Sequence, residues 1–281
     1  MKIGKYAVHI IESGYFGLDG GAMFGIVPKP LWERTNPPDK ENRIKLATRN
    51  LLLISDSKKI LVDTGMGKKW SDKNKQIYDI DQKSSSLEQS LSMLNLKAED
   101  ITDVILTHLH FDHTGGSTVR NDGRLEPAFP NAIYYVQKQN FQWAINPSER
   151  DAGSYIKENF MPLRDAGVLL QIEGEKKLDD EIDFIIVNGH TFGQQLLKIS
   201  DSVNTILYCC DLFPTTSHIP LPYVMGYDLQ PLVTVDEKKK ILKSALDEDW
   251  KLFFEHDPET VYATVSSTEK GIHIKDKFQG F

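Results

Sequence analysis

The pattern of apolar and polar residues in the first sixty positions predicts β-strands. Apolar and polar residues alternate from Lys2 to Ile11, and two further runs, Ile44–Ile54 and Lys59–Val62, flank the polar segment Ser55–Lys58. Alternation with a period of two is typical of strands with one buried face, and a short polar link between two such runs predicts a hairpin. The chain therefore begins with a β-rich region.

Short apolar runs in the rest of the chain predict buried strands, and most of them are followed within about three residues by a histidine or an aspartate. Because side chains at strand ends gather at the edge of a sheet, such residues can form one site. The predicted strands are Val104–Leu106, Pro130–Gln137, Phe184–Val187, Thr205–Tyr208 and Leu252–Phe254.

Two sequences of the form Ser/Thr-x-x-Glu predict the starts of helices. Ser85 with Glu88, and Thr234 with Glu237, have the spacing of a capping box. Apolar residues follow each at helical spacing, so each helix is expected to bury one face. These residues are Leu87, Leu91 and Leu94 in the first helix, and Ile241, Leu242, Ala245 and Leu246 in the second.

A segment rich in glycine and proline, residues 15–32, is strongly apolar and has the period of neither a regular helix nor a strand. It can be a loop packed on the core, or an apolar wall that contacts substrate or a second subunit in a homodimer. Met23, Phe24 and Trp32 are the candidate substrate-binding residues in this segment.

The composition of the chain excludes some classes of function. The 281 residues carry a net charge of -7, which argues against nucleic-acid binding because that relies on clustered Lys and Arg. The first fourteen residues include Lys2 and Glu12, so they lack the apolar core of a signal peptide or a membrane span. The adjacent Cys209 and Cys210 cannot staple distant segments. We therefore expect a cytoplasmic protein with a small-molecule substrate and no membrane partner.

Four strong metal-ligand side chains follow the strand Val104–Leu106 within six positions. They are His108, His110, Asp112 and His113. In an extended segment the first two imidazoles project to the same side, and a turn can bring the other two side chains around the same point. Burying so many imidazoles and a carboxylate without a cation would be costly. The segment therefore predicts a metal site.

His108-x-His110-x-Asp112-His113 resembles the signature of the metallo-β-lactamase superfamily of metallohydrolases. The resemblance extends, in the family's order, to Leu61–Gly65, Gly189–Thr191, Cys210–Leu212 and Glu255–Asp257. It implies an αββα sandwich, with two mixed β-sheets flanked by helices. Because ligands occur from His108 to His256, a domain boundary between them would split the site, and we predict a single domain spanning residues 1–281.

The resemblance also assigns roles to residues. Asp63 would orient a ligand histidine through its free ring nitrogen. Many relatives have Gly-His-Thr-Pro-Gly-His where this chain has Gly189–Gln194, so the second shell after His190 departs from the family's pattern. By resemblance, His108, His110 and His190 hold one metal, Asp112, His113 and His256 hold the other, and Asp211 bridges them.

Imidazole and carboxylate ligands suit zinc, iron, manganese or cobalt, and we expect two zinc ions. The resemblance implies hydrolysis of an ester or lactone by a metal-bridging hydroxide. Asp112 or a nearby acid would complete proton transfer. His218, downstream of Asp211, is a candidate either for a hydrogen bond with the substrate or for a structural role. The segment 15–32 is similar to that of bacterial quorum-quenching lactonases, which suggests an acyl-homoserine lactone as substrate.

Other functions fit the same ligands. A glyoxalase II-like thioesterase would need basic groups for glutathione carboxylates, and a nuclease would need a phosphate-binding surface. A mononuclear iron dioxygenase of the persulfide type would use part of the ligand set and would require oxygen. A metal-dependent binding module without catalysis is the remaining alternative.

Overall fold

The computed structural model describes residues 1–269 and 271–281. Contacts divide the chain into two compact units, and each unit consists of two segments. Unit 1 contains Met1–Tyr15 and Thr48–Gly174, and unit 2 contains Phe16–Ala47 and Glu175–Phe281. The single domain predicted from the sequence remains a prediction. Among the described residues, no helix is long and apolar enough to cross a membrane.

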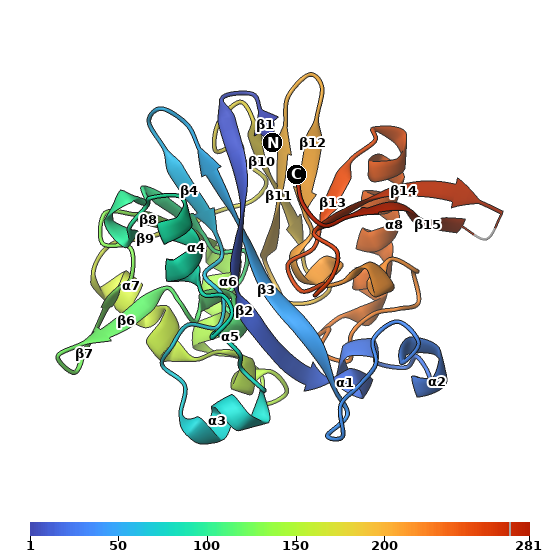
Figure 1. Cartoon of the computed structure of the whole chain (residues 1–281), viewed down its shortest axis with the longest axis horizontal. Helices are drawn as coiled ribbons and strands as arrows, with labels where there is room; N and C mark the ends of the chain where they lie inside the picture. Colours follow the sequence, from blue (N-terminus) through green and yellow to red (C-terminus); the bar gives the residue numbers. More distant parts are fainter. Residues whose placement is uncertain (270) are drawn as a thin grey trace. The chain divides into compact units, whose positions relative to one another are not determined.

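Unit 1 is built on a seven-stranded mixed sheet with the order β1-β2-β3-β4-β5-β8-β9 (Figure 1). The pairs β1/β2 and β3/β4 are antiparallel, and β4, β5, β8 and β9 are parallel. The β3/β4 pairing confirms the predicted hairpin. The strands are β1 (Lys2–Ile3), β2 (Tyr6–Asp19), β3 (Arg43–Ile54), β4 (Lys59–Val62), β5 (Asp103–Ile105), β8 (Ile133–Gln137) and β9 (Leu169–Ile172).

Three helices of unit 1, α4, α6 and α7, bury apolar side chains in the core that covers this sheet. Leu87 and Leu91 of α4 join a core that includes Val104 and Leu106. The predicted cap is displaced by one residue, because the Ser86 side chain accepts from Gln89 N and Ser85 lies outside the helix. The helices are α3 (Asp72–Ile77), α4 (Leu87–Met93), α5 (Phe111–Thr114), α6 (Lys138–Ile145) and α7 (Met161–Asp165), with 3₁₀ turns η1 (Ala98–Asp100), η2 (Ala152–Ser154) and η3 (Lys157–Asn159). A separate hairpin pairs β6 (Thr118–Asn121) with β7 (Arg124–Pro127).

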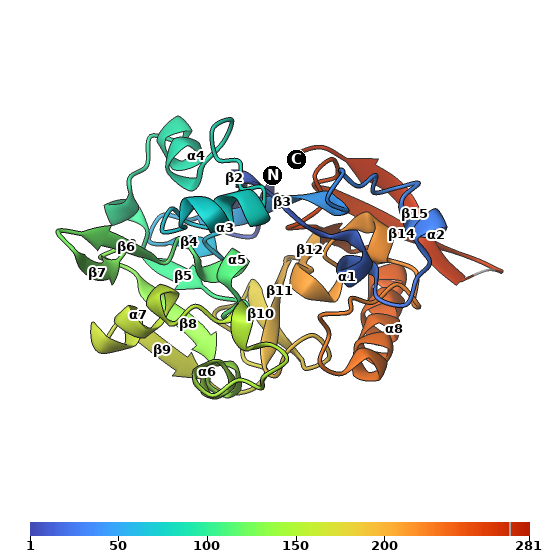
Figure 2. The ribbon, with the colours of Figure 1, turned by 90° about the horizontal axis from the view of Figure 1, so that it is seen from below.

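Unit 2 contains a six-stranded sheet in sequence order, β10 to β15. All neighbours are antiparallel except β12 and β13, which are parallel and connected through α8 (Pro231–Asp247). This helix packs against β14 (Figure 2). The strands are β10 (Ile182–Val187), β11 (Gln194–Ser200), β12 (Thr205–Tyr208), β13 (Lys251–Phe253), β14 (Tyr262–Thr268) and β15 (Gly271–Phe278).

The predicted cap of this second helix is wrong. The helix begins at Pro231, with Gln230 as its N-cap, so Thr234 lies inside it. Proline suits the first turn of a helix because its fixed φ is already helical and its missing N–H would have no partner there. The proline therefore places the start of the helix four residues before the position that the capping-box spacing indicates.

The apolar segment at residues 15–32 is more regular than the sequence predicted. β2 continues to Asp19, and two short helices follow, α1 (Gly20–Phe24) and α2 (Lys29–Trp32). Gly20 is required here, because a Cβ atom at this position would lie 2.4 Å from the Trp32 ring. The exposed apolar side chains of the segment are Ile26 and Leu31, which are 88% and 47% exposed.

Met23, Phe24 and Trp32 are all buried inside unit 2. The Phe24 ring stacks on Trp32 at 5.4 Å between centroids and on the imidazole of His218 at 4.6 Å. The prediction that these three side chains form an exposed recognition surface is therefore wrong. Phe24, Trp32 and His218 form a small stack of rings, which the sequence near residue 24 does not indicate because His218 is distant in the chain.

Candidate metal centre

Unit 1 gathers four potential metal ligands in one buried turn. The chain leaves β5 at Ile105 and enters the short helix α5, which contains Asp112 and His113. All four side chains are buried. Nε2 of His108 lies 2.9 Å from Nδ1 of His110, and the His108 and His113 ring centroids are 4.1 Å apart. The strand-end motif therefore places several imidazoles within reach of one another, as the sequence predicted.

Asp63, at the end of β4, holds this turn in place. One carboxylate oxygen accepts from the backbone N–H of Thr107 at 2.8 Å, and the other accepts from the Thr107 hydroxyl at 2.7 Å. The second oxygen also lies 3.0 Å from Nδ1 of His113. A carboxylate there favours the tautomer with a proton on Nδ1, which leaves Nε2 of His113 as the available ligand atom.

The backbone after β4 packs tightly on the backbone of the metal-binding turn. Thr64 donates to the His113 carbonyl from both its N–H and its hydroxyl, at 2.8 and 2.9 Å. A Cβ atom at Gly67 would lie 2.0 Å from the Gly115 carbonyl oxygen, and one at Gly116 would lie 2.2 Å from the Thr64 carbonyl oxygen. Only glycine permits this approach, which fixes the turn from both sides.

Unit 2 places a carboxylate between two buried histidines. Asp211 lies in η4 (Cys210–Leu212), directly after β12. Its two oxygens lie 3.0 Å from Nε2 of His190 and 3.1 Å from Nε2 of His256. The Nδ1 atom of His256 donates to the carbonyl of Ala47 at 2.8 Å. Both imidazoles therefore turn Nε2 toward the same carboxylate.

Asp228 is a site residue that the sequence did not reveal. Its Oδ1 atom lies 3.0 Å from Nδ1 of His190, and its side chain is buried. Burial opposes protonation of His190, but Asp211 and Asp228 together raise the pKa of this imidazole to about 10. The surroundings of His190 thus favour positive charge. Asp228 has no motif around it and follows His190 by 38 positions, so no local signal identifies it.

The loop before His190 is held by the helix α8. Glu237 accepts from the backbone N–H groups of Asn188 and Gly189 at 2.7 and 3.0 Å, and burial raises the pKa of this carboxyl. A Cβ atom at Gly189 would lie 2.3 Å from Oγ1 of Thr234. The two residues predicted to cap α8 therefore position the loop that carries His190.

His218 lies in η5 (Thr216–His218) and has partners on both ring nitrogens. Nε2 donates to the Met23 carbonyl at 2.9 Å, and Nδ1 accepts from the Thr215 hydroxyl at 2.8 Å. Burial lowers the pKa of His218 to about 4, so the ring is neutral at pH 7. The predicted hydrogen bond from His218 to a substrate is contradicted by this geometry. The residue instead connects η5 to α1.

The donor set fits transition-metal ions in each unit considered by itself. Unit 1 offers buried imidazoles and Asp112, and unit 2 offers Asp211 with one oxygen toward each of two imidazoles. In three histidines the other ring nitrogen has an oxygen partner, as is usual for histidines that bind metals. Imidazole and carboxylate ligands suit zinc, iron, manganese or cobalt.

The chain is similar to known proteins along most of its length. A family model described as "Metallo-beta-lactamase superfamily" matches residues 46–256. An N-acyl homoserine lactonase from Bacillus thuringiensis is 26% identical over 220 residues, which are 74% of this chain and 80% of the relative. The N-acyl homoserine lactonase AttM from Agrobacterium fabrum is 27% identical over 179 residues, which are 60% of this chain and 63% of the relative.

Solved structures share the fold. A probable metal-dependent hydrolase from Staphylococcus aureus has a TM-score of 0.88 and 28% identity, with 99% of this chain and 100% of that chain covered. AidC, a dizinc quorum-quenching lactonase solved with a product, N-hexanoyl-L-homoserine, has a TM-score of 0.82 and 23% identity, with 99% and 96% covered. These likenesses confirm the predicted fold class of mixed sheets flanked by helices.

Proposed function

The chain belongs to the metallo-beta-lactamase superfamily and is a metal-dependent hydrolase, and we propose that it opens the ring of an N-acyl homoserine lactone. The curated relatives with that activity in their names support the proposal. So does the net charge of -7, which does not suit an anionic thioester or a phosphodiester as substrate.

The proposal rests above all on Asp211. Its two oxygens lie 3.0 and 3.1 Å from ring nitrogens of two buried histidines, His190 and His256. A carboxylate with one oxygen directed to each of two ligand groups has the chemistry required of a ligand shared by two cations.

Following the family's order of motifs, we propose that seven residues hold a pair of metal ions. His108, His110 and His190 would hold one ion, and Asp112, His113 and His256 the other, with Asp211 shared. The pair is proposed to be zinc, since imidazole and carboxylate ligands suit zinc and the neighbour AidC is a dizinc enzyme. When bound, the ions would lower the pKa of a water molecule and polarise the lactone carbonyl.

The chain's own residues contribute orientation and proton transfer. Asp63, Asp228 and the Ala47 carbonyl each accept from Nδ1 of a different histidine, which fixes the tautomer and the direction of Nε2. Asp112 is buried beside His113 and is the candidate to take the proton of the attacking water and to return it to the alkoxide. The acyl C–O bond breaks, and the product carries one carboxylate and one hydroxyl.

The apolar segment contributes to this proposal differently from the way the sequence suggested. Met23, Phe24 and Trp32 are buried, so the proposal does not place the acyl tail against a surface that they form. Their stack instead supports η5, which follows Asp211 closely in the chain. The homodimer and the cytoplasmic location remain predictions from the sequence.

The experiment that tests the substrate compares kcat/KM for N-hexanoyl-homoserine lactone, a glutathione thioester and a phosphodiester, with metal content held fixed. The lactone should be hydrolysed fastest. Faster turnover of the thioester would favour the glyoxalase II-like alternative. Turnover that stops when oxygen is removed would favour the iron dioxygenase.

A further inference from the structure

A cavity of about 680 Å³ lies in unit 1, and its lining includes Thr64, Gly67 and Gly116, which pack against the metal-binding turn. Its volume is within the range of about 300–1,000 Å³ that is typical of small-molecule sites. Within the described part of the chain, none of the seven proposed metal ligands lines it. The cavity therefore needs an explanation of its own.

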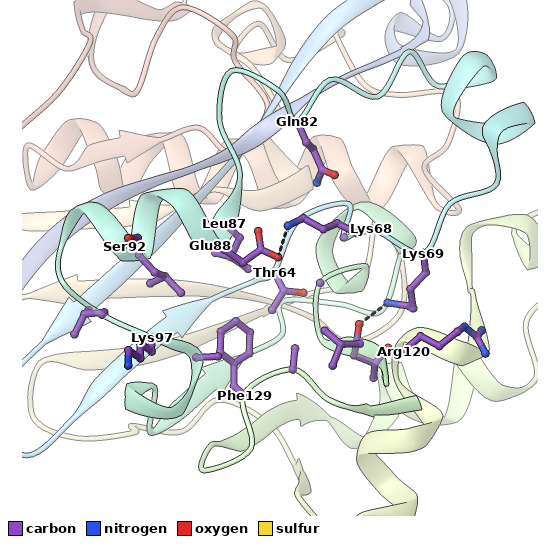
Figure 3. Close-up of a pocket in the computed structure, with 18 of the residues that line it drawn as sticks. Thr64, Lys68, Lys69, Gln82, Leu87, Glu88, Ser92, Lys97, Arg120 and Phe129 are labelled. Carbon is purple, nitrogen blue, oxygen red and sulfur yellow. Dashed lines mark hydrogen bonds and ion pairs between the residues drawn. The ribbon is translucent and has the colours of Figure 1, made fainter. Parts of the chain in front are cut away.

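The walls of the cavity are apolar and largely aliphatic. The helix α4 and the turn that follows it form one wall, and the segment after β7 forms another. The Phe129 ring is directed into the space between them (Figure 3). The apolar lining residues are Trp70, Leu87, Leu91, Leu96, Ala98, Val119, Ala128 and Phe129.

The rim of the cavity is cationic. Four basic side chains line it, against the single carboxylate of Glu88. Figure 3 shows Lys69 and Arg120 on one side and Lys97 on the other. Lys68 is paired with Glu88 at 2.9 Å and Arg120 with Glu158 at 3.0 Å, so these two charges are already balanced.

Lys69 is half-buried, and it has no carboxylate partner among the described residues. Its Nζ atom donates to the carbonyls of Gly115 and Thr118. Burial lowers the pKa of Lys69 to about 8, so the side chain is still mainly protonated at pH 7. An ammonium group has three N–H bonds, and two of them are used by these carbonyls. One donor is left for a ligand.

We propose that this cavity binds an acyl chain that ends in a carboxylate, with the chain between the α4 leucines and Phe129 and the carboxylate on Lys69. A single remaining N–H suits one carboxylate oxygen, whereas phosphate sites usually combine several donors. The aliphatic lining suits a methylene chain, whose burial stabilises the complex by roughly 0.8 kcal/mol per methylene. The proposal is independent of the lactone reaction.

Isothermal titration calorimetry of the metal-loaded protein with dodecanoate tests the site, with dodecanol and dodecyl phosphate as matched probes. Dodecanoate should bind, and dodecanol should bind at least about tenfold more weakly because it lacks the charge. Equal binding of dodecanol would overturn the role of Lys69. Tighter binding of dodecyl phosphate would overturn the choice of carboxylate.

Three variants test whether dodecanoate binds in this cavity. Lys69→Met keeps the length of the side chain and should weaken dodecanoate binding at least about tenfold. Ala128→Phe fills the cavity from a partly exposed wall and should abolish binding. Lys243→Met removes an exposed lysine on α8 and should leave binding unchanged. Unchanged affinity in both Lys69→Met and Ala128→Phe, with the fold intact by circular dichroism, would place the ligand elsewhere and refute the proposal.

Discussion

Replacing Asp228 by Asn should weaken metal binding at His190 without unfolding the protein. The Asp228 carboxylate lies 3.0 Å from Nδ1 of His190, and both side chains are buried. Asn has nearly the same volume and can still accept the Nδ1–H bond, but it loses the negative charge. The substitution therefore isolates the electrostatic part of the interaction.

The expected loss of metal affinity follows from the type of hydrogen bond that His190 makes with residue 228. A hydrogen bond to a charged group contributes about 1.5–3 kcal/mol, and a neutral one about 1 kcal/mol. The difference, roughly 0.5–2 kcal/mol, corresponds to about a two- to thirtyfold loss of metal affinity. Loss of a partner of this kind ordinarily costs about 10–100-fold in metal affinity or activity, and Asp228→Ala should lie at the upper end of that range.

Competition with a chromophoric chelator measures the affinity, and kcat/KM for a lactone should fall in parallel. Asp236→Asn is the matched control, because Asp236 lies on the exposed face of α8 and pairs only with Lys239 among the described residues. If Asp228→Asn binds metal as tightly as the unaltered protein, then the carboxylate does not orient His190 and the reasoning is wrong.

Three further outcomes are expected. In chemical denaturation, Phe24→Ala should lower the free energy of unfolding by about 3–5 kcal/mol, because it removes the ring stacked on Trp32 and His218. The control Ile26→Ala, at an 88% exposed position, should change this free energy little. Burial lowers the pKa of Lys238 to about 7, against 10.5 in the unfolded chain, so the unfolded chain binds more protons between these pH values. The free energy of unfolding should therefore rise from pH 7 to pH 9 more steeply than in Lys238→Met. Urea titrations that give the same pH dependence for both proteins would contradict this. Finally, kcat/KM should increase with the acyl length of the lactone by up to about fourfold per methylene, and a flat series would exclude burial of the tail.

Local sequence patterns predicted the parts of the fold and site that local physics controls. The β3/β4 hairpin depends on alternation and a polar turn, and the turn of His108–His113 depends on a buried strand that ends in polar ligands. The same logic placed Asp211 after β12. Each of these features is contained within one continuous stretch of sequence.

Features that depend on distant parts of the chain were not predictable in this way. Asp228 meets His190 because the loop before α8 pairs with the loop after β10, where Leu229 and Gln230 donate to the His190 and Gly189 carbonyls. Glu237 has the spacing of a cap, but its carboxylate binds backbone N–H groups of that same loop. Burial of Phe24 likewise depends on His218, which no pattern near residue 24 indicates.

The metal content and lactone-opening rate of the purified protein and of Asp211→Ala test the central claim most directly. We expect about two transition-metal ions per chain in the unaltered protein, as one shared carboxylate requires. Asp211→Ala should lose metal and should not open N-acyl homoserine lactones, while circular dichroism shows an intact fold. An Asp211→Ala protein that opens the lactone at a near-normal rate would contradict the account.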